Sequence, residues 1–125
     1  MSHPRASSTT ELEAVDVTDD GGTALKTIGR EEPYLSGHYP GNPIYPGVFL
    51  FDLCEKLASS CPAIPRPFDR LDSLRFFAPA LPGDRVRIEL TLRRSAAGTV
   101  IGAAFLGRST VEDQQKLFTV RMSYA

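Results

Sequence analysis

Apolar and polar side chains alternate most regularly in residues 85–93, where the apolar positions are Val86, Ile88, Leu90 and Leu92. A period of two is typical of a strand with one buried face. Five other segments alternate less regularly and complete the predicted strands: 11–17, 23–28, 71–77, 99–108 and 117–124. Segments rich in turn-forming residues separate most of them: 19–22, 78–84 and 95–98. Because most of these strands follow one another directly, we expect an antiparallel sheet.

A second pattern, with helical spacing, covers Gly47 to Ser59. Pro46 suits the first turn of a helix, and the serines, cysteine and proline of residues 59–62 end the apolar run. The first two turns are apolar nearly all round, so other parts of the chain must cover them. The polar positions form a single stripe: Asp52, Glu55, Lys56 and Ser59. We therefore predict an α+β fold in which an antiparallel β-sheet wraps around one central helix. In the strand at 99–108, the small residues Gly102, Ala103 and Ala104 would let a helix or a ligand come close.

Residues 37–47, with the sequence GHYPGNPIYPG, lead directly into this helix. Three prolines restrict φ and three glycines permit tight turns, so this segment is expected to hold one conformation. It would place His38 just before the helix. On general grounds, a histidine in such a loop is more often structural than catalytic.

Length and composition narrow the class of protein. The chain has 125 residues, of which 42% are hydrophobic and 23% charged, and we expect one domain at 11–125 after a polar, disordered lead-in at 1–10. The net charge of −1 argues against nucleic-acid binding through overall positive charge. Because there is neither an apolar window of about 20 residues nor a secretory signal, we expect a cytoplasmic protein with no membrane span. Cys54 and Cys61 lack the spacing of metal ligands, so we expect free thiols and no metal site.

Arginine is concentrated in the middle of the chain. The residues concerned are Arg66, Arg70, Arg75, Arg85, Arg87, Arg93 and Arg94. Such a group is either a solvated face or a docking surface for an acidic partner, and the solvated face is the commoner case.

Two blocks of residues resemble a known family. Residues 37–48 followed by Asp52, and then residues 75–84 with the sequence RFFAPALPGD, are similar to the two signature regions of the β-hydroxyacyl-acyl carrier protein dehydratases, the FabZ/FabA-like enzymes of fatty acid and polyketide synthesis. The resemblance implies the hot-dog fold. It also implies a dimer in which two sheets join edge to edge, formed either by two copies of this chain or with a related hot-dog subunit.

The dehydration of a β-hydroxyacyl thioester needs three kinds of group. A neutral imidazole suits removal of the α-proton because its pKa lies near working pH. A carboxylic acid suits protonation of the departing hydroxyl. Backbone N–H groups at a helix start can hold the negative charge that develops on the thioester oxygen.

The resemblance assigns these roles to individual residues. It implies that His38 is the base, that Asp52 is its acid/base partner on the other protomer, and that the Gly47 N–H, beside Val48, polarises the thioester. Four aromatic residues are candidates for the wall of the acyl tunnel: Tyr39, Tyr45, Phe76 and Phe77. The family uses no metal or nucleotide cofactor, and its substrate is held on the phosphopantetheine of acyl carrier protein, which is therefore the expected partner.

Other interpretations remain at this point. Asp52 alone is more often half of an i,i+4 ion pair with Lys56. The family more often has Glu where this chain has Asp52, and residues 53–56 depart from its usual helix sequence.

The alternative functions are an acyl thioesterase, which also occurs on hot-dog folds, and a non-catalytic subunit of a heterodimeric dehydratase.

Overall fold

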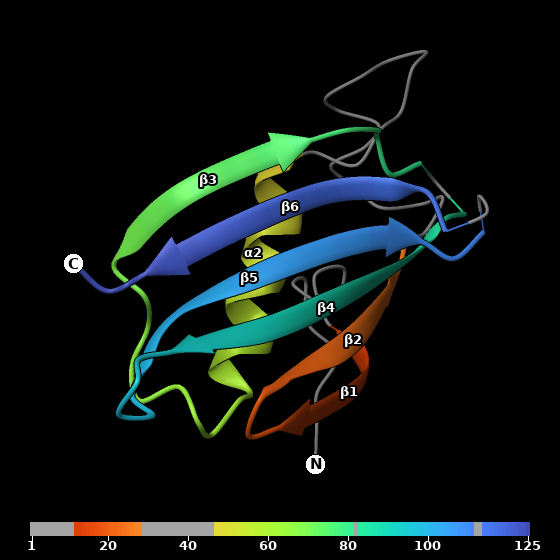
Figure 1. The fold of residues 1–125 in the computed structure, drawn as a ribbon. Coiled ribbons are helices and arrows are strands. Elements are labelled where there is room, and N and C mark those ends of the chain that lie inside the picture. Colours follow the sequence, from red (N-terminus) through yellow and green to blue (C-terminus); the bar gives the residue numbers. More distant parts are fainter. Residues whose placement is uncertain (1–11, 29–46, 82, 112–113) are drawn as a thin grey trace.

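The computed structural model describes residues 12–28, 47–81, 83–111 and 114–125, with side chains in the helix described from Leu50 onward. These residues form a six-stranded sheet and one helix (Figure 1). The elements in chain order are β1 (Glu13–Thr18), β2 (Gly21–Thr27), α2 (Gly47–Ser59), β3 (Arg70–Phe76), β4 (Arg85–Arg94), β5 (Val100–Ser109) and β6 (Lys116–Ser123).

All neighbouring strands in the sheet pair antiparallel, in the order β1-β2-β4-β5-β6-β3. The strands and helix predicted from the sequence are therefore confirmed, with ends that differ by a few residues. Strand β3 does not lie beside β2 or β4, the strands before and after it in the chain. The chain leaves the sheet after β2, passes along α2, and returns beside β6. Strand β3 therefore forms one edge of the sheet, opposite the edge formed by β1, and the last strand, β6, lies inside the sheet.

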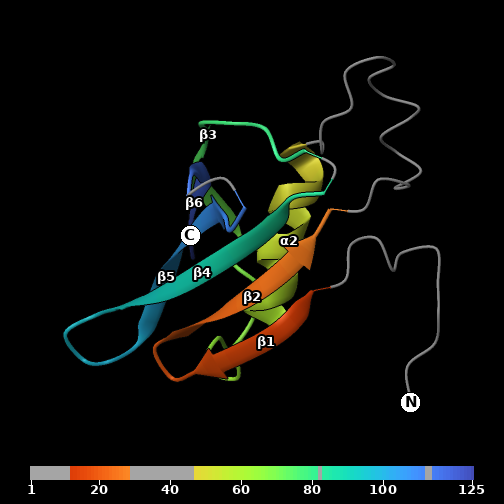
Figure 2. The same cartoon turned by 90° about the vertical axis from the view of Figure 1, so that its right-hand side faces the viewer.

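Helix α2 lies against one face of the sheet, and β1 and β2 curl toward it (Figure 2). Its buried side chains from Leu50 onward meet the inward side chains of the strands, among them Ile88, Phe105 and Val120, which are 0–1% exposed. Its polar stripe faces away from this core, and Asp52 is half-buried while Glu55 and Lys56 are exposed. Amphipathic spacing thus places one side of the helix in the core, as predicted.

One sequence interpretation needs correction, and another is confirmed in part. The β1–β2 turn is shorter than residues 19–22, because β2 begins at Gly21. Gly21 has a φ of +152°, and a Cβ at this position would clash with the Leu90 carbonyl of β4. The small residues of β5 were expected to admit a helix or a ligand. Ala103 is fully buried in the core that includes the helix side chains, whereas Gly102 makes room for the guanidinium of Arg93.

Two predictions concern parts of the chain that lie outside the described residues: the lead-in at 1–10 and the turn at 37–46. Within the described residues, no helix is both long and apolar enough to span a membrane. Cys54 and Cys61 are free and buried, as expected.

Candidate functional site

Gly47 and Val48 form the first turn of α2. The first four N–H groups of an α-helix have no acceptor within the helix, and the positive end of the helix dipole lies there. This turn carries no acidic side chain, so no negative charge of its own competes for these groups. The backbone at the start of α2 is therefore suited to hold a developing oxyanion.

Asp52 lies in the second turn of α2, half-buried beside the fully buried Leu53 and Cys54. In the described part of the chain, no ion pair joins Asp52 to Lys56, so the i,i+4 pair considered above does not form. Burial raises the pKa of the Cys54 thiol, which is therefore neutral and unsuited to nucleophilic attack. Asp52 is the acidic side chain of α2 that is partly shielded from solvent.

Of the other residues with predicted roles, the structure describes only Phe76 and Phe77. His38, Tyr39 and Tyr45 lie outside the described residues. Phe76 is on β3 opposite Phe118, and it is 49% exposed on the face of the sheet that carries α2. Phe77 follows β3, and the ammonium group of Lys116 lies 5.1 Å from its ring centroid.

A group of hydrogen bonds around Asp84, called the Asp84 clamp below, holds the end of β2 against the turn before β4. The Ile28 N–H donates to the Asp84 carbonyl at 2.8 Å, and the Gly83 N–H donates to the Ile28 carbonyl at 2.7 Å. The buried Asp84 carboxylate accepts hydrogen bonds from the Ser109 hydroxyl at 2.6 Å and the Arg85 N–H at 2.9 Å. These bonds hold Ile28, the last described residue before the sequence block that contains His38, against the turn at Asp84. The Pro-Gly-Asp turn was visible in the sequence, but its bond to β2 was not.

Replacing Asp84 by Ala is expected to lower the free energy of unfolding by about 1–3 kcal/mol, because buried donors lose a charged acceptor. Urea denaturation followed by circular dichroism measures the change. Asp72→Ala, at an exposed ion pair with Arg70, is the control and should change stability by less than about 1 kcal/mol. Equal effects for the two variants would mean that the clamp contributes no more than a surface ion pair.

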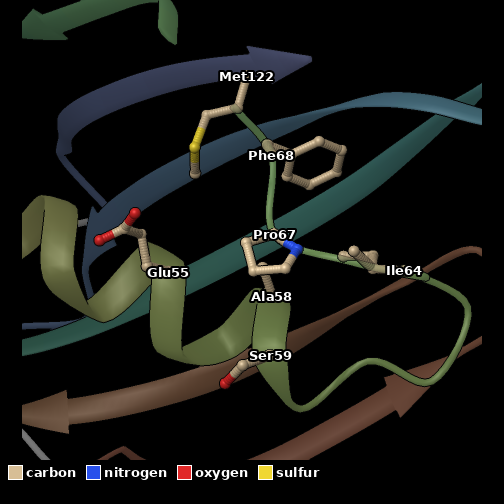
Figure 3. A pocket seen from close by; sticks show the side chains of 7 residues that line it. All are labelled: Glu55, Ala58, Ser59, Ile64, Pro67, Phe68 and Met122. Carbon is tan, nitrogen blue, oxygen red and sulfur yellow. The ribbon is translucent and has the colours of Figure 1, made fainter. Parts of the chain in front are cut away.

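A pocket of about 220 Å³ opens at the other end of α2 (Figure 3). Ala58 and Met122 are buried at its base, and Ile64 and Phe68 are half-buried at its sides. The remaining lining residues are exposed at its mouth: Glu55, Ser59 and Pro67. Met122 reaches from β6 toward α2, between Pro67 and the Glu55 carboxylate (Figure 3).

Comparison with known proteins identifies the family. A family model described as ApeI dehydratase matches residues 15–107, which is most of the chain. The chain belongs to the ApeI-like dehydratase family. The sequence resemblance predicted membership of the FabZ/FabA-like dehydratases, and this prediction is confirmed.

Relatives of this ApeI-like chain also carry the names of dehydratases. A protein of Pelotomaculum thermopropionicum named 3-hydroxyacyl-[acyl-carrier-protein] dehydratase FabZ is 33% identical over 114 residues, covering 82% of this chain and 81% of the relative. A protein of the same name from Chloroflexus aggregans is 38% identical over 96 residues, covering 71% of this chain and 65% of the relative. The predicted dehydratase function, and with it the class of hydro-lyase, is confirmed.

Solved structures show the same fold. A chain of the dehydratase heterocomplex ApeI:P from Xenorhabdus doucetiae superposes with a TM-score of 0.69 at 16% identity, covering 85% of the ApeI-like chain and 88% of that chain. An uncharacterised protein from Erwinia carotovora gives a TM-score of 0.70 at 22% identity, with 90% of both chains covered. The predicted hot-dog fold is confirmed.

Proposed function

We propose that this ApeI-like dehydratase removes water from 3-hydroxyacyl thioesters carried on the phosphopantetheine of acyl carrier protein, and releases the 2,3-enoyl thioester. The observation that carries the proposal is the half-buried Asp52, without an ion pair to Lys56, on a helix whose first turn has N–H groups free of intrahelical acceptors. The names of the relatives support the substrate class.

In the proposed reaction, His38 takes a proton from the α-carbon and Asp52 gives a proton to the leaving hydroxyl. The C–O bond breaks as the α,β double bond forms, and the products are the enoyl thioester and one water molecule. The N–H of Gly47 stabilises the negative charge on the thioester oxygen. Both proton transfers use side chains of the protein, so the proposal needs no metal or nucleotide cofactor.

We further propose that a second hot-dog chain joins at the edge strand β3. Three residues of β3 lie opposite inward side chains of β6, yet α2 leaves them 37–49% exposed: Leu71, Leu74 and Phe76. An edge strand with unpaired backbone groups and uncovered apolar side chains is a site for pairing with another strand. The heterocomplex of the Xenorhabdus doucetiae neighbour fits association between two such chains.

The proposed docking surface for the acidic carrier protein is narrower than the arginine group seen in the sequence. Arg66 and Arg70 pair with neighbouring aspartates, Arg87 pairs with Glu89, and Arg94 donates to two backbone carbonyls. Arg75 is exposed on β3, which ends close to the start of α2 (Figures 1 and 2), and Lys116 lies beside Phe77. These two cations are the proposed contacts, and the other arginines mostly serve local structure.

Incubation with a 3-hydroxyacyl carrier protein, followed by mass spectrometry of the carrier, tests the proposed reaction. We expect the acyl group to remain on the carrier and to lose one water. Release of the free acid and the free carrier thiol would instead identify a thioesterase. An unchanged carrier with this chain alone, but dehydrated carrier after addition of a related hot-dog chain, would assign it as a partner subunit.

A further inference from the structure

The face of the sheet opposite α2, which is toward the viewer in Figure 1, carries two arginines whose charge is not compensated. Arg93 of β4 and Arg121 of β6 lie on this face, because side chains alternate along each strand and Leu90 and Val120 face the core. Neither guanidinium forms an ion pair with a described residue. The Nε of Arg93 is enclosed and lacks a hydrogen-bond acceptor in the same part of the chain.

The guanidinium of Arg93 lies over Gly102 of β5, in space that a Cβ at Gly102 would fill. Gly102 is opposite Ser123 of β6, whose hydroxyl accepts a hydrogen bond from the Arg70 Nε at 3.0 Å. Opposite residues of antiparallel strands have Cα atoms about 4.5–5.5 Å apart, so these two guanidinium groups lie over neighbouring positions. Arg121 is on the same face, two residues or about 7 Å along β6 from Ser123. Three guanidinium groups therefore gather over one small part of the sheet.

The carboxylates of this region do not neutralise that charge. Strands β3, β4, β5 and β6 contain two acidic residues, and both are in ion pairs: Asp72 with Arg70, and Glu89 with Arg87. Cations held this close repel one another, and a bound anion offsets the repulsion. A guanidinium donates two parallel hydrogen bonds to a phosphate group, which makes arginine well suited to bind phosphate.

A trough of about 390 Å³ begins beside Arg121 on the same face. Its floor contains Ala104 and Leu106 of β5, both half-buried, and Thr91 of β4 and Thr119 of β6 lie on either side. The other polar side chains of its lining are farther from Gly102: Glu89 and Lys116. Small-molecule sites have volumes of roughly 300–1,000 Å³, so the trough has room for the organic part of a small ligand.

We propose that Arg93 and Arg121 bind the phosphate group of a small phosphomonoester, whose organic part lies in the trough. The small side chains of β5 leave the space that the ligand occupies. Because this site is on the face of the sheet opposite α2 and Asp52, its ligand does not compete with the carrier-bound substrate. The inference goes beyond the proposed dehydration and does not depend on it.

Isothermal titration calorimetry at constant ionic strength, with inorganic phosphate and with phenyl phosphate, tests the two parts of the site. We expect Arg121→Gln and Arg93→Gln each to raise Kd for both probes about tenfold or more, because each change removes charge-assisted hydrogen bonds. Arg121 is exposed, so Arg121→Gln decides the matter if Arg93→Gln folds poorly. Ala104→Leu fills the floor of the trough. It should raise Kd for phenyl phosphate about tenfold and Kd for inorganic phosphate less than about threefold.

Arg87→Gln is the matched control, since Arg87 is an exposed arginine of the same face that pairs with Glu89. It should change either Kd less than about twofold. An equal loss of binding in Arg87→Gln and Arg121→Gln would overturn the inference, because the probes would then respond only to the overall charge of the face. Absence of saturable binding of either probe to the wild type would also overturn it. Equal Kd values for the two probes would contradict the placement of the organic part in the trough.

Discussion

Replacing Asp52 by Asn, or His38 by Ala, is expected to slow the loss of water by a factor of about 100 to 10,000. Each change removes one group that moves a proton in the proposed reaction, while Asn keeps the size and most of the polarity of Asp. Because Asp52 is half-buried and has no ion pair with Lys56, Asp52→Asn should alter stability little. The measurement is the rate of enoyl formation on a four-carbon carrier-protein substrate.

Asp16→Asn makes the same chemical change at an exposed carboxylate of β1 and should keep the wild-type rate. Circular dichroism and thermal melts confirm that all three variants are folded. If either His38→Ala or Asp52→Asn keeps the full rate in the folded state, that residue has no part in proton transfer.

Mixing the two inactive variants should restore activity, because the proposed site combines His38 of one protomer with Asp52 of the other. Random pairing in a symmetric dimer gives about half mixed dimers, each with one intact site out of two, so about a quarter of the wild-type activity is expected. Relative to a parent with at most about 1% activity, this is a gain of about 25-fold or more. The two variants are co-expressed with different tags, and the whole mixture is assayed after the share of doubly tagged dimers has been measured.

The edge strand provides the control for this experiment. Leu74 is 37% exposed on β3, so Leu74→Asp should cost little in folding while it places a charge at the proposed interface. With Leu74→Asp in both chains, mixing should restore nothing and light scattering should report monomers. Stable mixed dimers without recovered activity would place both residues of each site in one protomer.

The alternation in the sequence was sufficient to predict most of the fold. Strands β4, β5 and β6 alternate with a period of two, and α2 has helical spacing with a polar stripe, so local pattern and burial agree. The position of β3 was not predictable in this way. Its apolar residues read as a half-buried strand, and only pairing with β6 across the fold makes it the exposed edge.

Part of the candidate site was likewise predictable from the sequence, and part was not. The two signature blocks identified Asp52, the helix start at Gly47 and the turn at Asp84 as a family pattern. They did not indicate that Asp84 bonds to β2 and β5, since those contacts join residues far apart in the chain. They also gave no sign of the pocket, because Ala58, Phe68 and Met122 lie outside both blocks and come together only in the fold.

By itself, then, the sequence determined the element types, the central helix and the dehydratase family. These depend on local spacing and on short motifs, in which neighbouring residues carry the information. Only the tertiary structure decided which strand lies at the open edge, how the end of β2 is held, and where an apolar pocket forms beyond Asp52. These depend on long-range packing between elements, whose geometry no local pattern in the chain specifies.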